Sequence, residues 1–142
     1  MLARFTILFF IITIAFSSCE TNDGEVQTTQ VSSILEVNVP DTMVTRQSYP
    51  LEITYQKDSN CHRLSGFDVV QQGDSLIFVR AITLFTQAVN CNESPESVLE
   101  EVSFTNTYQS NFKFKFLKDA DSLGNFIYIE KNVIVKEELI EE

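Results

Sequence analysis

The sequence feature that most constrains the fold is a strict alternation of apolar and charged residues near the C-terminus. Phe112, Phe114 and Phe116 alternate with Lys113 and Lys115. Successive side chains of a β-strand point to opposite faces, so this period of two predicts a strand with one buried and one solvent-facing side. The same period recurs in other runs, at residues 35–39, 51–55, 67–69, 102–104 and 127–135.

Turn-forming residues separate these runs. Residues 72–74 (Gln-Gly-Asp) are typical of a hairpin turn, and residues 76–85 are apolar on both faces, as in a central strand or a short buried helix. The β-branched and aromatic residues favour the strand. Ser94 and Pro95 suit the start of one helical turn. We therefore expect an all-β fold, an antiparallel immunoglobulin-like β-sandwich of about seven strands over residues 31–136.

The N-terminus has the three parts of a secretory signal. Arg4 provides the positive charge, residues 5–16 are apolar, and Ser17 and Ser18 precede a cysteine. The apolar run is shorter than the roughly 20 residues that a spanning helix needs. We expect residues 1–18 to be a signal peptide, residues 19–30 a flexible tether that begins with Cys19, and residues 137–142 an acidic tail.

Residues 16–19 (Phe-Ser-Ser-Cys) resemble the lipobox of bacterial lipoproteins, although Phe16 replaces the usual leucine. The resemblance implies that Cys19 is lipidated and becomes the first residue of the mature protein. An ordinary signal peptide cut after Ser18, which would leave Cys19 a free thiol, is the alternative. The two other cysteines, Cys61 and Cys91, are an even number in an exported chain, which predicts a disulfide between them.

The chain also resembles small lipoproteins of the Bacteroidota. The shared features are Asn60-Cys61-His62 before Gly66-Phe67, a second Asn90-Cys91, and the strand at residues 112–116. The resemblance implies an outer-membrane lipoprotein that faces the periplasm or the cell surface, and no particular activity. Glu20, Asp23 and Glu25 after the cysteine are similar to a surface-export signal of that group, but they suit a solvated linker equally well.

The charge balance bears on partners. The chain has 10 Lys and Arg against 20 Asp and Glu. Nucleic acids and anionic lipid surfaces attract basic patches, and no run of basic residues is present. The sequence therefore argues against both as partners and leaves the membrane contact to the lipid.

Candidate sites for chemistry are few. His62 is the only histidine and follows Cys61, but neighbours on an extended chain point to opposite sides, so we expect no catalytic pair. Asp119, Asp121 and Glu130 match three positions of a calcium loop, with Gly124 at a fourth. A plain hairpin loop explains the same residues, and we expect neither a metal nor a cofactor.

Two further sets of residues concern contact with partners. Thr42, Ser75 and Ser122 each follow Asp and precede an apolar residue, a pattern similar to the O-glycosylation sites of exported Bacteroidota proteins. An acidic loop pinned by the disulfide is expected to hold Glu93, Glu96, Glu100 and Glu101. We expect a lipid-anchored, non-enzymatic module that acts by binding or adhesion, with a protein or glycan as its partner. The alternative is an inhibitor or immunity-type protein that blocks an enzyme with the acidic loop.

Overall fold

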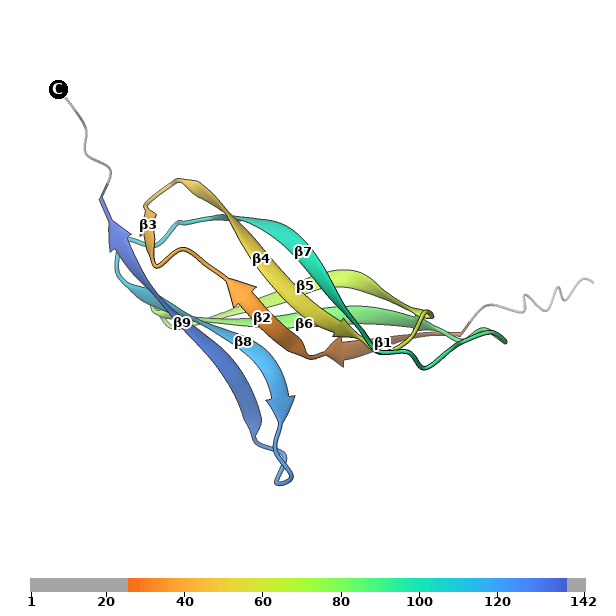
Figure 1. The fold of residues 1–142 in the computed structure, drawn as a ribbon. Coiled ribbons are helices and arrows are strands. Elements are labelled where there is room, and N and C mark those ends of the chain that lie inside the picture. Colours follow the sequence, from red (N-terminus) through yellow and green to blue (C-terminus); the bar gives the residue numbers. More distant parts are fainter. Residues whose placement is uncertain (1–25, 138–142) are drawn as a thin grey trace, which may run out of the picture.

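The computed structural model describes residues 26–137, which form nine β-strands and no helix (Figure 1). The signal peptide, Cys19, the first part of the tether and residues 138–142 lie outside the described residues. The strands, in chain order, are β1 (Gln27–Ser32), β2 (Ile34–Asn38), β3 (Thr42–Val44), β4 (Ser48–Lys57), β5 (His62–Gln72), β6 (Leu76–Thr86), β7 (Glu96–Thr105), β8 (Phe112–Ala120) and β9 (Phe126–Lys136). They make two packed sheets, so the predicted all-β sandwich is confirmed.

The larger sheet is organised around β6, the apolar run predicted to be a central strand. One edge of β6 pairs with β5 along nearly its whole length. The other edge is divided, because Ala81–Thr86 pair with β1 in antiparallel fashion whereas Leu76–Val79 pair with β8 in parallel. Beyond β8 come β9 and then the short β3, which pairs in parallel with the end of β9. The sheet is therefore mixed: most strand pairs are antiparallel, as expected, and two pairs, β6 with β8 and β3 with β9, are parallel.

The smaller sheet has three antiparallel strands, β2, β4 and β7, with β4 in the centre. The chain passes from one sheet to the other at Ser33, whose carbonyl accepts a hydrogen bond from Gln56 of β4 (2.9 Å). Strand β1 lies before the first predicted strand, mostly in the segment expected to be the tether, whereas β2 corresponds to the predicted run at residues 35–39. Together with the unpredicted β3, β1 accounts for nine strands where about seven were expected.

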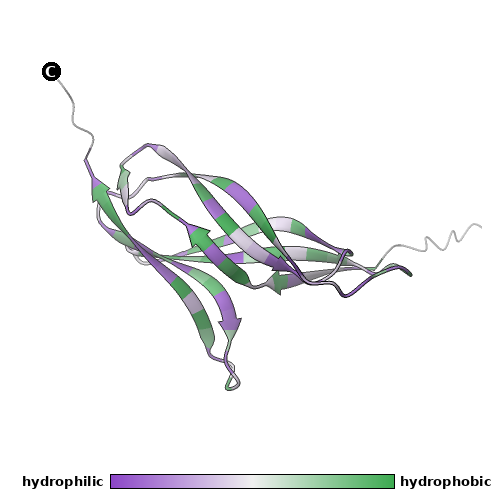
Figure 2. Ribbon diagram, viewed as in Figure 1, coloured by the Kyte–Doolittle hydropathy of each residue, from purple (hydrophilic) through white to green (hydrophobic). Residues whose placement is uncertain are grey.

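The core is aromatic at its centre. Phe112, Phe114 and Phe116 are 3, 1 and 0% exposed, and each faces the smaller sheet. The Phe114 ring lies 5.1 Å from that of Phe104 on β7 in an edge-to-face arrangement, a geometry that adds to the gain from burial. Hydrophilic and hydrophobic residues alternate along strands of both sheets (Figure 2), as the period of two requires.

Two boundaries differ from the sequence prediction. Strand β1 begins at Gln27, so Gln27–Gln30, expected to belong to the tether, pair with Thr83–Thr86 of β6. The helical turn expected after Ser94 is absent, because Glu96 already begins β7 and pairs with Lys57 of β4. In both places pairing with a long neighbouring strand overrides the local preference. The residues from 26 to 137 include no helix that is long and apolar enough to cross a membrane.

Candidate interaction surfaces

The disulfide joins the two ends of the β5–β6 hairpin. Cys61 precedes β5, Cys91 follows β6, and the two are bonded with their Cα atoms 5.4 Å apart, as predicted. The Thr86 amide donates to the Cys61 carbonyl (3.1 Å), and Asn60 Oδ1 accepts from the Asn92 amide (2.7 Å). The same end holds the start of β1, because Gln87 N–H donates to the Val26 carbonyl (3.1 Å). We call this region the disulfide end.

His62 lies just inside the disulfide end and is buried. Its Nδ1 is 2.7 Å from Ser59 Oγ and its Nε2 is 2.8 Å from Gln30 Oε1, while its ring lies 4.9 Å from that of Phe85. It borders a hollow of about 320 Å³ that is also lined by Asp58, Glu93 and Pro95. Because both ring nitrogens have partners within the protein, His62 serves here to join β1, β5 and the preceding turn.

The acidic residues expected on one loop are spread over different parts of the structure. Only Glu93 lies in the loop; Glu96 begins β7 and forms an ion pair with Lys57 (2.6 Å). Glu100 and Glu101 follow on β7 and point to opposite faces, since Glu100 pairs with the buried Ile53 and Glu101 with Glu52. Glu100 thus lies on the inner side, where burial raises the pKa of Tyr55 and the Glu100 carboxylate raises it further. The single acidic loop was therefore a wrong prediction.

Glu100 has a different role on the edge of the smaller sheet. Among the strands of residues 26–137, β7 pairs only with β4, so no described strand lies along its other edge. A charged side chain that points inward on an edge strand discourages the strand of another molecule from pairing there. Glu100 is half-buried, on the same side of β7 as Val98 and Val102. This is the placement with which natural edge strands discourage edge-to-edge pairing.

The three calcium-loop candidates are not brought together. Asp121 holds the β8–β9 turn, where its carboxylate accepts from the amides of Leu123 and Asn125 and from Asn125 Nδ2 (2.8–2.9 Å). Glu130 lies in the middle of β9, opposite Lys115, and both Lys113 and Lys115 contact it. Within residues 26–137 no three His, Cys, Asp or Glu side chains lie close enough to hold a metal ion. The segment is a hairpin turn.

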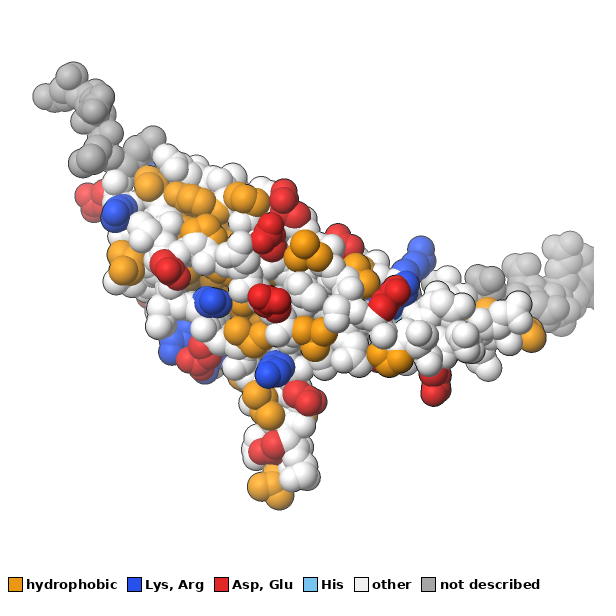
Figure 3. Space-filling view, viewed as in Figure 1, with side chains coloured by type: hydrophobic (Ala, Val, Ile, Leu, Met, Phe, Trp, Pro, Cys, Tyr) orange, Lys and Arg blue, Asp and Glu red, His pale blue; other side chains and the backbone are white. Residues whose placement is uncertain are grey.

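The β8–β9 hairpin extends beyond the sandwich. Strand β8 pairs with β6 only up to Phe116, and from there β8 and β9 continue as a two-stranded ribbon (Figure 1). Figure 3 shows this ribbon standing out from the body with hydrophobic side chains near its tip, where Leu123 is 86% and Phe126 64% exposed.

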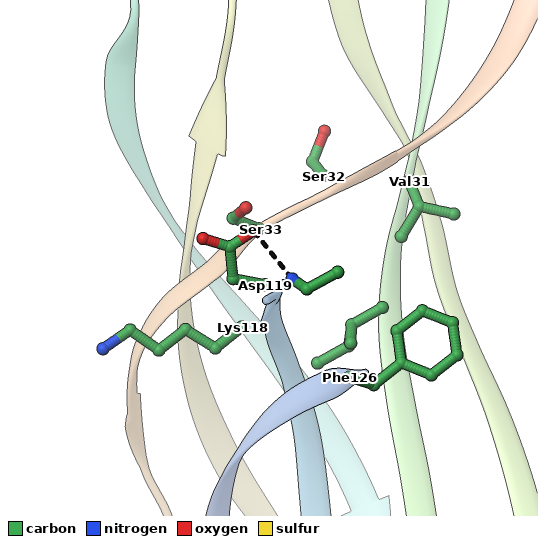
Figure 4. A pocket seen from close by; sticks show the side chains of 8 residues that line it. Val31, Ser32, Ser33, Lys118, Asp119 and Phe126 are labelled. Atoms are coloured by element: carbon green, nitrogen blue, oxygen red, sulfur yellow. Dashed lines mark hydrogen bonds between the residues drawn. The ribbon is translucent and has the colours of Figure 1, made fainter. Parts of the chain in front are cut away.

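A hollow of about 180 Å³ lies between the base of this ribbon and the end of β1. Val31 and Phe126 lie on one side of it, and Lys118 and Asp119 on the other (Figure 4). Asp119 uses its carboxylate to accept from the adjacent Ala120 amide (2.7 Å), which is the bond drawn in the figure. The hollow is small and open, and its carboxylate is already engaged.

The outer faces of the two sheets carry opposite charges. Register places Glu36, Glu52 and Glu101 on the outside of the smaller sheet, which we call the acidic face. On the outside of the larger sheet, four cationic side chains and two acidic ones lie on β5, β6, β8 and the middle of β9, and we call this set the basic face: Arg63, Arg80, Lys113, Lys115, Asp68 and Glu130. Lys136 has the same strand parity at the end of β9. No run of basic residues is visible in the sequence, because these four cations come from three strands. All four occupy outward-facing positions of their strands, and that they share one face can be recognised only once the strand pairing is known.

Ion pairs and aromatic rings order the centre of the basic face. Glu130 accepts from Lys113 Nζ (2.7 Å) and Lys115 Nζ (3.0 Å), and Asp68 forms an ion pair with Arg80. Lys115 Nζ lies 5.9 Å from the centre of the Phe78 ring and 5.6 Å from that of Tyr128, within the range of cation–π attraction. The two rings meet edge to face at 5.5 Å.

The lysine pair makes stability depend on pH. The Lys113 ammonium, and next that of Lys115, hold the pKa of the Glu130 carboxyl below its ordinary value of 4.5. Because the pKa is lower in the folded state, this contribution to stability is present above about pH 4.5 and is lost as the pH falls through the folded-state pKa.

We therefore expect the free energy of unfolding of the Glu130→Gln variant to fall less than that of the parent protein when the pH is lowered from 6 to 3. Urea unfolding at several pH values in that range checks this. Identical pH profiles for the two proteins would mean that the lysines do not favour the ionised form of Glu130.

The three predicted glycosylation positions differ in accessibility. Ser75 is exposed in the β5–β6 turn and Ser122 is exposed in the β8–β9 turn. Thr42 is the first residue of β3 and is half-buried. The structure thus leaves Ser75 and Ser122 open to modification and encloses Thr42 more closely.

Comparisons with protein-family models, with curated proteins and with solved structures find no match to this chain. What the structure defines is a mixed β-sandwich with a disulfide at one end, an acidic face and a basic face.

Proposed function

We propose that this protein is a lipid-anchored, non-enzymatic module of the cell envelope that acts by binding or adhesion. The observation that carries the proposal is the order of parts in the chain. Gln27, the first residue of the sandwich, is only the eighth residue after Cys19 of the lipobox-like Phe16-Ser17-Ser18-Cys19. Two or more acyl chains would hold such a domain stably at a membrane.

The short link sets the orientation of the domain. Eight extended residues span at most about 28 Å, so a lipid on Cys19 keeps the start of β1 close to the membrane. The disulfide end shares that position, since Thr86 pairs with Gln27 and bonds to Cys61. The β3–β9 end lies at the opposite end of the sandwich, and both outer faces extend between the two ends, where a partner can reach them.

The proposal has three further parts, which concern location, glycosylation and fold relationship. The location is the outer membrane, facing the periplasm or the outside. Glycosylation at Ser75 and Ser122 suits an exported domain because both lie in exposed turns. An immunoglobulin-like relationship is supported by the size of the domain and its two packed sheets.

The intact mass of the protein, extracted with detergent from its native host, tests the anchor. We expect a mass above that of the polypeptide 19–142 by a diacylglycerol and an acyl chain. A further hexose-type increment on peptides with Ser75 or Ser122 is expected if these sites are glycosylated. A Cys19→Ala variant, which should stay unlipidated and leave the membrane fraction, is the control. A parent mass equal to the bare polypeptide would overturn the proposed function.

A further inference from the structure

The fold sorts the charges of an acidic protein onto separate surfaces. The whole chain has a net charge of −10, yet the basic face gathers four of its ten Lys and Arg side chains. Both acidic groups on that face are engaged, Asp68 by Arg80 and Glu130 by the two lysines. Cations are therefore in excess there, and a surface with excess positive charge attracts anions whatever the net charge of the molecule.

The shape of the basic face favours an extended ligand. It runs from Arg63 near the disulfide end to Asn132 and Ile134 near the β3–β9 end. At that far end lies a shallow groove of about 370 Å³, lined on its outer side by Ser75, Leu76, Asn111, Lys113, Asn132 and Ile134. A long and nearly flat surface of this kind contacts several units of a polymer, whereas a small molecule is held in a concave pocket.

The chemistry of the side chains fits sugars that carry acid groups. Lys113 and Lys115 supply charge for carboxylates or sulfates, and Asn132 supplies an exposed amide for hydroxyl groups. Phe78 and Tyr128 lie beside Lys115 and are half-buried, so part of each ring is open to the apolar face of a pyranose. A charged group, an amide and a ring thus occur within one strip across β6, β8 and β9.

We infer that the basic face binds an acidic polysaccharide, a chain of sugars that bear carboxylate or sulfate groups. The positive charge of the face attracts the acid groups. The sugar rings contact the groove, its amide side chains, and the aromatic pair Phe78 and Tyr128. The inference rests on the proposed function only in taking contact with a partner as the role of the module. The face runs along the length of the sandwich, so an anchor at the disulfide end leaves it accessible.

Binding of the detergent-extracted full chain to immobilised alginate, a polyuronate, tests the inference, with neutral dextran as the reference polymer. We expect binding to alginate and not to dextran, and a loss of affinity as salt rises and screens the charges. The double substitution Lys113→Gln/Lys115→Gln should weaken alginate binding by about tenfold or more. Arg63→Gln, at an exposed position of the same face, provides a second variant.

Lys57→Gln/Lys131→Gln is the matched control, because it removes the same charge away from the basic face. The Lys57 side chain is 24% exposed and ion-paired, close to the 25% of Lys115. We expect the control to bind alginate as the parent does. Equal weakening by both double variants, equal binding to dextran, or binding to phosphatidylglycerol vesicles in place of alginate would overturn the inference. Since lipidation of Cys19 is read from the mass, failure here leaves the proposed anchor standing, and the reverse also holds.

Discussion

Phe114→Ala is expected to lower the free energy of unfolding by about 3–5 kcal/mol, the range found for a buried aromatic side chain cut back to alanine. Phe114 is 1% exposed and packs edge to face on Phe104 and Phe112, so it joins the two sheets at the centre of the core. The loss combines the transfer energy of the ring with the cavity that its neighbours cannot fill. Since the whole free energy of unfolding of a small domain is only roughly 5–15 kcal/mol, the Phe114→Ala variant should unfold at a much lower urea concentration than the parent.

Urea unfolding followed by circular dichroism measures the effect. Phe126→Ala is the matched control, because it removes the same side chain at a position that is 64% exposed on the β8–β9 hairpin. We expect that control to change stability by no more than about 0.5 kcal/mol. Similar losses in the two variants would show that Phe114 does not occupy the core position described here.

Removing the disulfide is the second change with a large expected effect. Cys61 and Cys91 are 30 residues apart in sequence, and the chain-entropy model gives about 3.5 kcal/mol for closing a loop of that length. The double variant Cys61→Ser/Cys91→Ser should therefore lose about that much stability, with the folded structure retained. The loss is expected because the unfolded chain, freed of its cross-link, gains conformational entropy.

Unfolding with and without a reductant provides the check. The parent protein should lose the same stability when reduced, whereas the double variant should respond to the reductant hardly at all. If reduction leaves the parent unchanged, then the register of β5 with β6 already confines the ends of the hairpin, and the cross-link adds little.

Sequence alone established the class of fold and most of the core. Alternation at residues 112–116 identified the strand whose phenylalanines are buried, and the apolar run at residues 76–85 identified the central strand β6. The pairing of Cys61 with Cys91 followed from counting cysteines in a chain that we expected to be exported. These properties depend on local periodicity and on composition, so they are readable before any long-range contact is known.

Strand partners and surface charge were decided only by the tertiary structure. A period of two states which residues share a face, but not which strand lies beside which, and so it did not foretell that β1 and β8 divide one edge of β6. Glu93, Glu96, Glu100 and Glu101 are neighbours in sequence and yet point in different directions, because β7 begins among them. Arg63, Arg80, Lys113 and Lys115 are far apart in sequence and lie on one face, because the register of β5, β6 and β8 aligns them.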